Sequence, residues 1–348
     1  MVEDVKSDVL IKTEKIHKDF PVLGGILMKP MAFVHAVDDV DLEVLRGETL
    51  GLVGESGCGK STLGRLILKL EDPTSGTVLF EDEDVQTYDR KKMQQYRKSA
   101  QIIFQDPYSS LDPRKPIGKT IEEPLIVHKI LGKKEARERA MELLELVGLR
   151  STYYYSYPHE FSGGQRQRVG IARALSLTPK FIVCDEPISS LDVSVQAQII
   201  NLLQELQNKF HLTYLFISHD LSVVHYISNR VAVMYLGRIV EMGLSQSVYK
   251  APQHPYTKAL LSASPVPNPF LERKKNILKG DVPTPLHPPA GCHFHTRCPY
   301  RLPLCDKEIP ALVHVEPNHL VRCFLFPQTQ ESHVAPPFTG GGALQQMI

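Results

Sequence analysis

The sequence lacks three features that would each indicate a particular class of protein. Its 40 lysines and arginines are balanced by 39 aspartates and glutamates, so it has no overall basic field of the kind that favours nucleic acid, although a local basic patch stays open. It has no run of about 18 apolar residues, so it has no candidate membrane span. Residues 1–8 lack the apolar core of a secretory signal, and a cytosolic location is the expectation.

The chain is long enough, at 348 residues, for one large domain and an appendage. Proline-rich sequence without clear alternation follows Met242, and we therefore expect domains at 1–250 and 251–348. Four of the six cysteines crowd into 32 residues of the second part, at Cys292, Cys298, Cys305 and Cys323. In a reducing compartment such a cluster is more typical of a metal site than of disulfides.

A glycine-rich segment lies between a predicted strand, 49–53, and a predicted helix, 63–70. This order suits a phosphate-binding loop, because glycine lets successive N–H groups turn toward an anion and the helix directs its positive end at the same anion. We expect Lys60 to reach the β- and γ-phosphates of a nucleotide and Ser61 to ligate Mg²⁺. The predicted nucleotide-binding residues are Gly54, Glu55, Ser56, Gly57, Cys58, Gly59, Lys60, Ser61 and Thr62.

Two later apolar segments predict buried parallel strands that end in polar residues. Residues 181–184 lead into Asp185 and Glu186, which suit a Mg²⁺ contact and the polarisation of an attacking water. Residues 213–217 are followed closely by His219. Ligands gather at the carboxyl ends of such strands, so the sequence predicts an α/β fold with these side chains at one edge.

The sequence between about 106 and 178 is helical in pattern, which predicts an inserted helical subdomain. A second candidate anion-binding helix start is formed by Ser162, Gly163, Gly164 and Gln165, and the helix is expected to continue to about residue 177. By itself this motif is a weak signal, because Ser-Gly-Gly is also common in loops. Near the N-terminus, Phe20 is expected to end a strand before a Gly/Pro-containing insert, 21–30. It could stack on adenine or fill the core.

In this order, the motifs resemble those of the ATP-binding subunits of ABC transporters over about residues 9–260. The Walker A motif corresponds to 54–62, the signature to 162–165, Walker B to 181–185 and the D-loop to 190–192. The resemblance implies an adenine-stacking role for Phe20, the Q-loop glutamine at Gln105, the catalytic glutamate at Glu186 and the switch histidine at His219. It also implies Mg²⁺ held by Ser61, Gln105 and Asp185, and catalysis by Glu186, His219 and Lys60.

A narrower resemblance, to the dipeptide/oligopeptide importer branch, rests on residues 104–111, 157–161, 254–260 and 291–299. It implies a head-to-tail pair of ATPase subunits whose signature residues act on the partner's ATP. It further implies a second, different ATPase subunit, two membrane permeases and an external peptide-binding protein, at the cytoplasmic face of the membrane. Residues 35–38 are more similar to the F-type ATPase of that branch.

Three alternatives stay open at this point. Nickel and sugar importers share much of this ATPase, so the transported solute is not fixed. A soluble ABC ATPase that acts on nucleic acid usually has two ATPase domains or dedicated nucleic-acid elements, whereas one set of motifs occurs here. The cysteine-rich end could also be an autonomous binding module.

The four clustered cysteines are separated by 5, 6 and 17 residues. Four thiolates suit Zn²⁺ or an iron–sulfur cluster, and free buried thiols are a third reading. The paired two-residue spacing usual in zinc ribbons is missing. Members of the peptide-importer branch carry a [4Fe–4S] cluster at such cysteines, so the resemblance implies this cluster as a structural clip.

Overall fold

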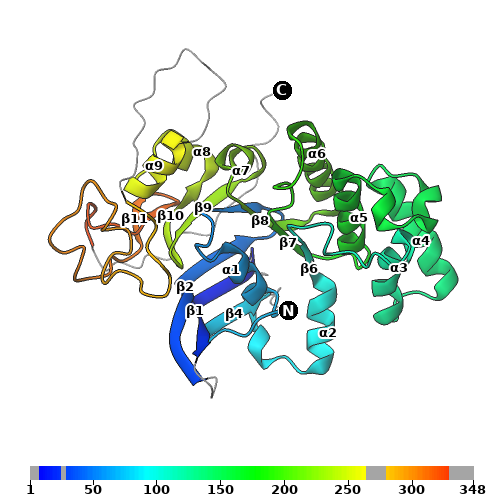
Figure 1. The fold of residues 1–348 in the computed structure, drawn as a ribbon, viewed down its shortest axis with the longest axis horizontal. Helices are drawn as coiled ribbons and strands as arrows, with labels where there is room; N and C mark the ends of the chain where they lie inside the picture. Colours follow the sequence, from blue (N-terminus) through cyan, green and yellow to red (C-terminus); the bar gives the residue numbers. More distant parts are fainter. Residues whose placement is uncertain (1–7, 25–28, 264–279, 329–348) are drawn as a thin grey trace, which may run out of the picture.

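The structure, a computed structural model, describes residues 8–24, 29–263 and 280–328 and contains two sheets flanked by helices (Figure 1). The core sheet has the spatial order β11 (Val313–Glu316), β12 (His319–Val321), β10 (Arg238–Leu244), β9 (Arg230–Tyr235), β3 (Thr49–Val53), β8 (Thr213–Ser218), β7 (Phe181–Asp185), β6 (Ala100–Ile103). The second sheet has the order β2 (Lys29–Leu45), β1 (Val9–Gly24), β4 (Ser75–Phe80), β5 (Glu83–Asp84).

Helices fill the connections between these strands. The α-helices in the described ranges are α1 (Lys60–Ile67), α2 (Arg90–Ser99), α3 (Ile117–Val127), α4 (Lys133–Leu146), α5 (Gly163–Leu175), α6 (Val193–Phe210), α7 (Leu221–Ile227), α8 (Ser245–Lys250) and α9 (Pro255–Ala263). Short 3-10 helices span Val85–Thr87, Ser151–Tyr155 and Pro158–Glu160. None of the helices in the described part of the chain is long and apolar enough to cross a membrane.

The centre of the core sheet is parallel, as the uninterrupted apolar segments predict. β9, β3, β8, β7 and β6 run side by side in the same direction. Every residue of β3, β7 and β8 is buried, because α1 and the second sheet cover one face of this part of the sheet and the helices α5, α6 and α7 cover the other. The carboxyl ends of β3, β7 and β8 therefore meet at one edge, where the phosphate loop begins.

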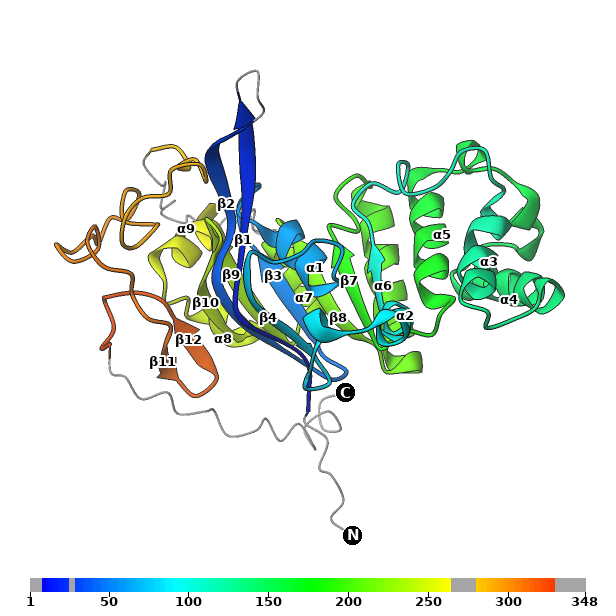
Figure 2. The same ribbon diagram turned by 90° about the horizontal axis from the view of Figure 1, so that it is seen from below.

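The N-terminal hairpin is longer than the sequence indicates, and the expectation that Phe20 ends a strand is wrong. β1 continues to Gly24 and β2 begins at Lys29, so most of the supposed insert is strand; its residues 25–28 lie outside the described ranges. Pro21 is tolerated because the pairing of β1 with β4 is last seen at His17, which leaves the outer hairpin two-stranded. Figure 2 shows this hairpin projecting past the core sheet.

The chain between β6 and β7 contains α3, α4 and α5, and Figure 1 places these helices together on one side of the sheet. The ring of Tyr154 packs where a Cβ on Gly118 would otherwise lie, at 2.1 Å, which brings the 3-10 helix after α4 directly onto α3. The Tyr154 hydroxyl donates to Glu122 at 2.5 Å. Where this helical region begins and ends as a subdomain, about 106–178, stays a prediction.

Strands from the C-terminal part extend the core sheet, because β12 pairs antiparallel with β10. A buried carboxylate joins the two: Glu241 of β10 is fully buried and lies 2.7 Å from His319 Nε2 on β12. Glu241 also accepts the backbone N–H groups of Gln253 and His254, at 2.7 and 2.9 Å. The domain limits 1–250 and 251–348 stay predictions, but this network ties the described residues after 250 to the ATPase-like part.

The network predicts a pH dependence of stability that depends on His254. Its imidazole is buried and accepts the N–H of Tyr256 at Nδ1, and burial lowers the pKa of His254 from its ordinary 6.5 to about 4. As the pH falls below about 6.5, the His254 imidazole therefore takes up a proton in the unfolded chain before it does so in the folded chain. Between pH 7.5 and 5 the free energy of unfolding should decrease by about 2 kcal/mol from this group alone.

The free energy of unfolding is measured with denaturant at both pH values. The wild type should exceed His254→Gln by a smaller margin at pH 5 than at pH 7.5. The matched control is His287→Gln, at an exposed position, whose difference from the wild type should not depend on pH. A pH-independent difference between wild type and His254→Gln would contradict a buried neutral imidazole.

Candidate nucleotide-binding site

The predicted phosphate loop joins β3 to α1 at the carboxyl edge of the core sheet. Gly59 caps α1 in the left-handed region, with φ of 105°, and a Cβ there would lie 2.1 Å from the carbonyl oxygen of Ala36. Only glycine fits this close approach to β2. Among the described residues no side chain caps the start of α1, so its first N–H groups remain for an anion.

Lys60 is folded back over this loop and is only 4% exposed. Its Nζ donates to the carbonyl oxygens of Gly54, at 2.8 Å, and Glu55, at 3.0 Å. The ammonium group is thus held at the centre of the loop by neutral acceptors. A phosphate oxygen there would offer it a charge-assisted hydrogen bond, which is stronger.

Two predicted magnesium ligands meet beside the loop. Ser61 Oγ donates to Asp185 Oδ1 at 2.6 Å, across the boundary between α1 and β7. Asp185 is 4% exposed, and burial raises the pKa of its carboxyl group, while the hydrogen bond from Ser61 and the nearby charge of Arg65 act in the opposite direction. A hydroxyl and a buried carboxylate at this spacing form an oxygen site of the kind that Mg²⁺ prefers.

Glu186 contacts two other predicted site residues, Gln105 and His219. Its Oε2 accepts from Gln105 Nε2 at 3.0 Å and lies 3.4 Å from His219 Nδ1. The backbone of Glu186 has φ of 45°, a left-handed conformation that costs energy for a residue with a side chain, and such strain concentrates at functional sites. The contact of Gln105 in this structure is with Glu186, and its role as a magnesium ligand stays a prediction.

Phe20 lies on β1, opposite Val34 of β2, and its side chain is partly exposed. Lys18 Nζ is 4.8 Å from the centre of its ring. A ring face that already attracts a cation is electron-rich and accessible, which suits stacking on a base. The adenine-stacking role of Phe20 stays a prediction.

The signature residues begin α5, in the helical region and not beside α1 (Figure 1, Figure 2). Ser162 and Gln165 form a reciprocal cap, in which Gln165 Oε1 accepts the N–H of Ser162 at 3.0 Å. A Cβ on Gly163 would lie 3.2 Å from Leu191, and one on Gly164 would lie 2.4 Å from Val195. The glycines therefore allow α5 to pack on the D-loop segment and the start of α6.

Three side chains of α5 bind the segment after β6, and the sequence analysis missed all of them. Arg173 Nη1 donates to the carbonyl oxygen of Ser110 at 2.5 Å, and Gln167 Nε2 donates to that of Phe104 at 3.5 Å. The Arg166 guanidinium lies 4.6 Å from the centre of the Tyr108 ring. A basic helix face next to a polar loop was the available signal.

The sequence matches the ABC transporter family over residues 37–189 and the C-terminal region of oligopeptide/dipeptide transporters over residues 240–305. It is 49% identical over 322 residues to the oligopeptide transport ATP-binding protein AppF of Bacillus subtilis, covering 92% of this chain and 98% of that protein. It is 48% identical over 325 residues to the dipeptide transport ATP-binding protein DppF of Haemophilus influenzae, covering 93% and 99%. The chain belongs to the ABC transporter ATP-binding proteins of the oligopeptide/dipeptide branch.

Solved structures of ATP-binding cassettes share the fold of this chain. The ATP-binding cassette MJ0796, in a dimeric post-hydrolysis state bound to ADP and phosphate, superposes with a TM-score of 0.61 at 28% identity, covering 68% of this chain and 99% of that one. CbiO1 of Clostridium perfringens, part of the transporter complex CbiONQ, gives a TM-score of 0.60 at 28% identity, covering 70% and 92%. The predictions of an α/β phosphate-loop fold and of an ABC-type ATPase are confirmed.

The C-terminal part of this ABC ATPase touches its phosphate loop, which the sequence analysis did not anticipate. The hydroxyl of Tyr256 accepts the backbone N–H of Glu55 at 2.9 Å. Arg297 is 7% exposed and donates two hydrogen bonds to the Glu55 carboxylate, at 2.8 and 3.1 Å. Both residues lie in segments noted only for their resemblance to the importer branch.

The four clustered thiols lie near one another. Cys305 and Cys323 are buried, and the backbone N–H of Cys292 donates to the carbonyl oxygen of Cys305 at 2.8 Å. Burial raises the pKa of the Cys292 thiol to about 11, and the other three cysteines contribute to that shift. The structure thus brings together the residues that the sequence grouped as a candidate site.

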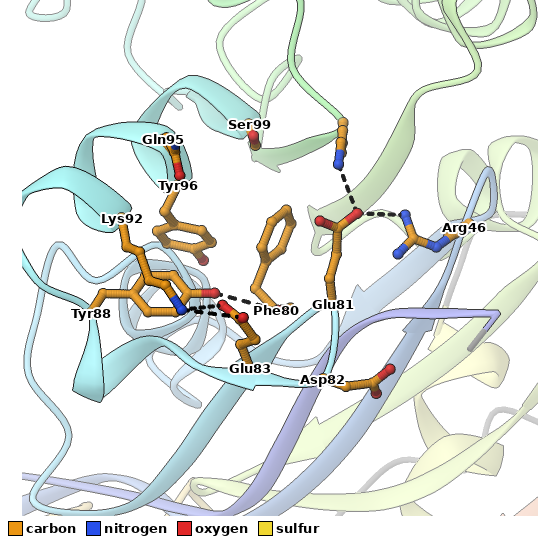
Figure 3. A pocket seen from close by; sticks show the side chains of 11 residues that line it. Arg46, Phe80, Glu81, Asp82, Glu83, Tyr88, Lys92, Gln95, Tyr96 and Ser99 are labelled. Atoms are coloured by element: carbon orange, nitrogen blue, oxygen red, sulfur yellow. Dashed lines mark hydrogen bonds and ion pairs between the residues drawn. The ribbon is translucent and has the colours of Figure 1, made fainter. Parts of the chain in front are cut away.

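A hollow of about 490 Å³ lies elsewhere, between α2 and the turn from β4 to β5 (Figure 3). Glu81 on its wall lies 2.9 Å from Arg46 and 2.8 Å from Lys180. Phe80, Tyr88 and Tyr96 form its apolar side. No residue that lines it belongs to a nucleotide-binding motif, so it is separate from the ATP site.

The contact of Arg297 with the loop predicts that its loss weakens nucleotide binding. Arg297→Ala should raise the Kd for Mg-ATP roughly 3- to 10-fold, because Glu55 loses a buried bidentate partner that fixes the loop, worth about 1 kcal/mol. Fluorescent-nucleotide titration measures this Kd.

The control is Arg301→Ala, which removes an exposed arginine paired with Asp306 at 2.7 Å and should leave the Kd unchanged. Glu55→Gln should weaken binding as well, and the double variant should lose less than the sum of the two effects. Additive effects would show that the pair does not position the loop.

Proposed function

We propose that this chain is the ATP-hydrolysing subunit that powers import of dipeptides or oligopeptides through a membrane ABC transporter. The observation that carries this proposal is the near-complete match to peptide-transport ATP-binding proteins, which includes the C-terminal region. That region contacts the phosphate loop through Tyr256 and Arg297, so the branch-specific part and the ATPase part form one unit.

Two such subunits meet head to tail in this proposal. The phosphate loop and the signature start different helices, α1 and α5, that lie in different parts of one chain, which supports completion of each site by a partner. Ser162, Gly163, Gly164 and Gln165 then act on the partner's ATP. The similarity to a cassette solved as a dimer supports the same arrangement.

Within one site, the loop N–H groups and Lys60 bind the β- and γ-phosphates. Ser61, Asp185 and Gln105 are the residues that would hold Mg²⁺, and the hydrogen bond of 2.6 Å from Ser61 to Asp185 places two of these oxygens side by side, where they would need to separate by about 0.3 Å to share a cation. Mg²⁺ held there would supply positive charge that offsets the charge of the phosphates during hydrolysis. Glu186 orients the attacking water, and His219, which is 58% exposed, is free to turn to the γ-phosphate.

Coupling to the membrane uses the segment that follows Gln105. Arg173 and Arg166 of α5 hold this segment through contacts with Ser110 and Tyr108. Because Gln105 contacts Glu186, a movement of Gln105 during hydrolysis would be transmitted through this segment to α5. Two permease subunits would bind beside this segment, and the chain would then lie at the cytoplasmic face of the membrane. A different homologous ATPase subunit and an external peptide-binding protein complete the proposed complex.

Glu186→Gln tests the assignment of the catalytic glutamate. The variant should keep its Kd for Mg-ATP, because the phosphates are held by the loop, and should lose steady-state hydrolysis by at least about 100-fold. Phosphate release and nucleotide binding are measured on the same preparation, assembled with its permeases in lipid vesicles.

In those vesicles the wild type should show peptide uptake that requires ATP, and Glu186→Gln should show none. Glu145→Gln, at a surface position of α4, is the control and should behave as the wild type. Normal turnover by Glu186→Gln would remove the assignment of Glu186. ATP-driven uptake of nickel but not of peptide would contradict the peptide substrate and identify nickel as the transported solute.

We further propose that Cys292, Cys298, Cys305 and Cys323 hold a [4Fe–4S] cluster. In the described ranges these sulfurs do not form a set of three within 4.8 Å of one another, whereas four thiolates on one Zn²⁺ lie roughly 3.8 Å apart. A cluster spreads its ligands over four irons, so it suits thiols that are near but not touching. Its role here is to clip the C-terminal part together beside Arg297.

Anaerobic purification tests this cluster. The wild type should contain about four irons and four sulfides per chain and absorb visible light, and Cys305→Ser should lose most of this iron. Cys184→Ser, in the buried strand β7, is the matched control and should keep it. A colourless protein with one zinc would favour the alternative metal, and a metal-free protein would favour free thiols.

A further inference from the structure

Two histidines and an aspartate converge on the hairpin of β1 and β2, outside the ATPase motifs. One ligand atom from each of His17, Asp19 and His35 lies within 4.8 Å of the others. His17 Nε2 is 3.1 Å, and His35 Nδ1 is 2.7 Å, from Asp19 Oδ1. We propose that this cluster binds a divalent transition-metal ion, with Zn²⁺ as the preferred ion.

The β1–β2 hairpin holds these three side chains in place, and its register shifts on both sides of Lys18, between His17 and Asp19. His17 and Asp19 are two residues apart on β1, and Asp19 pairs directly with His35 on β2. Cross-strand partners have Cβ atoms about 4.5–5.5 Å apart, which is close enough to share a metal ion. The side chains are 24%, 20% and 35% exposed, so the cluster is partly sheltered yet open to solvent.

The ligand atoms are nearly at metal-binding spacing. Two imidazole nitrogens and a carboxylate oxygen are a donor set that favours Zn²⁺ over Mg²⁺. Tetrahedral ligands about 2.0–2.1 Å from the metal are separated by roughly 3.3 Å. The distances of 3.1 and 2.7 Å therefore need to widen by about 0.2 and 0.6 Å, and a water would complete the site.

A second carboxylate orients His17 for this role. His17 Nδ1 lies 3.3 Å from Asp38 Oδ1, and Asp38 is itself fixed by Arg238, whose Nε donates to Oδ2 at 2.8 Å. Metal-bound histidines commonly donate their other ring N–H to a carboxylate in this way. A neutral imidazole has one N–H only, so a bond to Asp38 leaves the Nε2 lone pair facing the Asp19 carboxylate. A cation between the two makes that contact favourable.

The site lies next to the nucleotide-binding residues along both strands. Asp19 precedes Phe20, and His35 precedes Ala36, whose carbonyl oxygen occupies the space against Gly59. A bound metal would cross-link β1 and β2 at this point. It would therefore fix the strand pair that packs over the phosphate loop.

Titration of Zn²⁺ alone into the full-length chain, without nucleotide, tests the site by calorimetry. The wild type should bind one equivalent more than His17→Ala/His35→Ala. The matched control is His287→Ala/His314→Ala, two exposed histidines, which should keep that equivalent. Asp38→Asn should weaken this equivalent about 10- to 100-fold, as expected for a residue that positions a ligand. Excess Mg²⁺ should not displace it.

Two further measurements separate this site from the cysteines and from a folding defect. In NMR spectra of the wild type, the ring-nitrogen signals of two histidines should shift when Zn²⁺ is added. These signals are assigned to His17 and His35 because each is missing from the corresponding single variant. Co²⁺ at this site should lack the thiolate charge-transfer band that a cysteine-bound ion shows. Equal zinc stoichiometry in wild type and double variant, or unmoved ring signals of His17 and His35, would overturn the proposal and leave a hydrogen-bonded cluster without a metal ion.

Discussion

The parallel register of three buried strands is the constraint on which the catalytic arrangement depends. β3 and β7 both border β8, with Val53 beside Ser218 and Asp185 beside Ile217. The phosphate loop and the acidic pair therefore leave the sheet at the same level on either side of one strand. The hydrogen bond from Ser61 to Asp185 and the contacts of Glu186 follow from that register, and a shift by one residue would turn these side chains to the other face.

The phosphate loop is held from outside as well as from the sheet. β2 presses on it through the carbonyl oxygen of Ala36, and the C-terminal part reaches Glu55 through Tyr256 and Arg297. These contacts are short, buried and directed at backbone or carboxylate groups, so they fix loop geometry more than they add apolar burial. The loop thus depends on elements that come both before and after it in the sequence.

Much of the fold and of the site could be predicted because the signals were local. Largely apolar segments at 49–53, 181–184 and 213–217 predicted strands, and glycine-rich turns predicted phosphate contacts. The continuation of β1 past Phe20 could not be seen, because Pro21 normally argues against a strand and its tolerance depends on the absence of a third paired strand. Arg297 was missed for a related reason: its partner, Glu55, lies 242 residues away, and no local pattern encodes such a distance.

Because β12 covers the edge of β10, an ATPase part without the C-terminal strands would expose that edge. Removal of β12 would turn β10 into an open sheet edge with unpaired N–H and C=O groups, and would leave Glu241 without His319. Such an edge invites pairing with strands of other chains. The C-terminal strands therefore cover β10 and leave the short strand β11 as the edge of the sheet, and a shortened chain would need a polar replacement on β10 to limit such pairing.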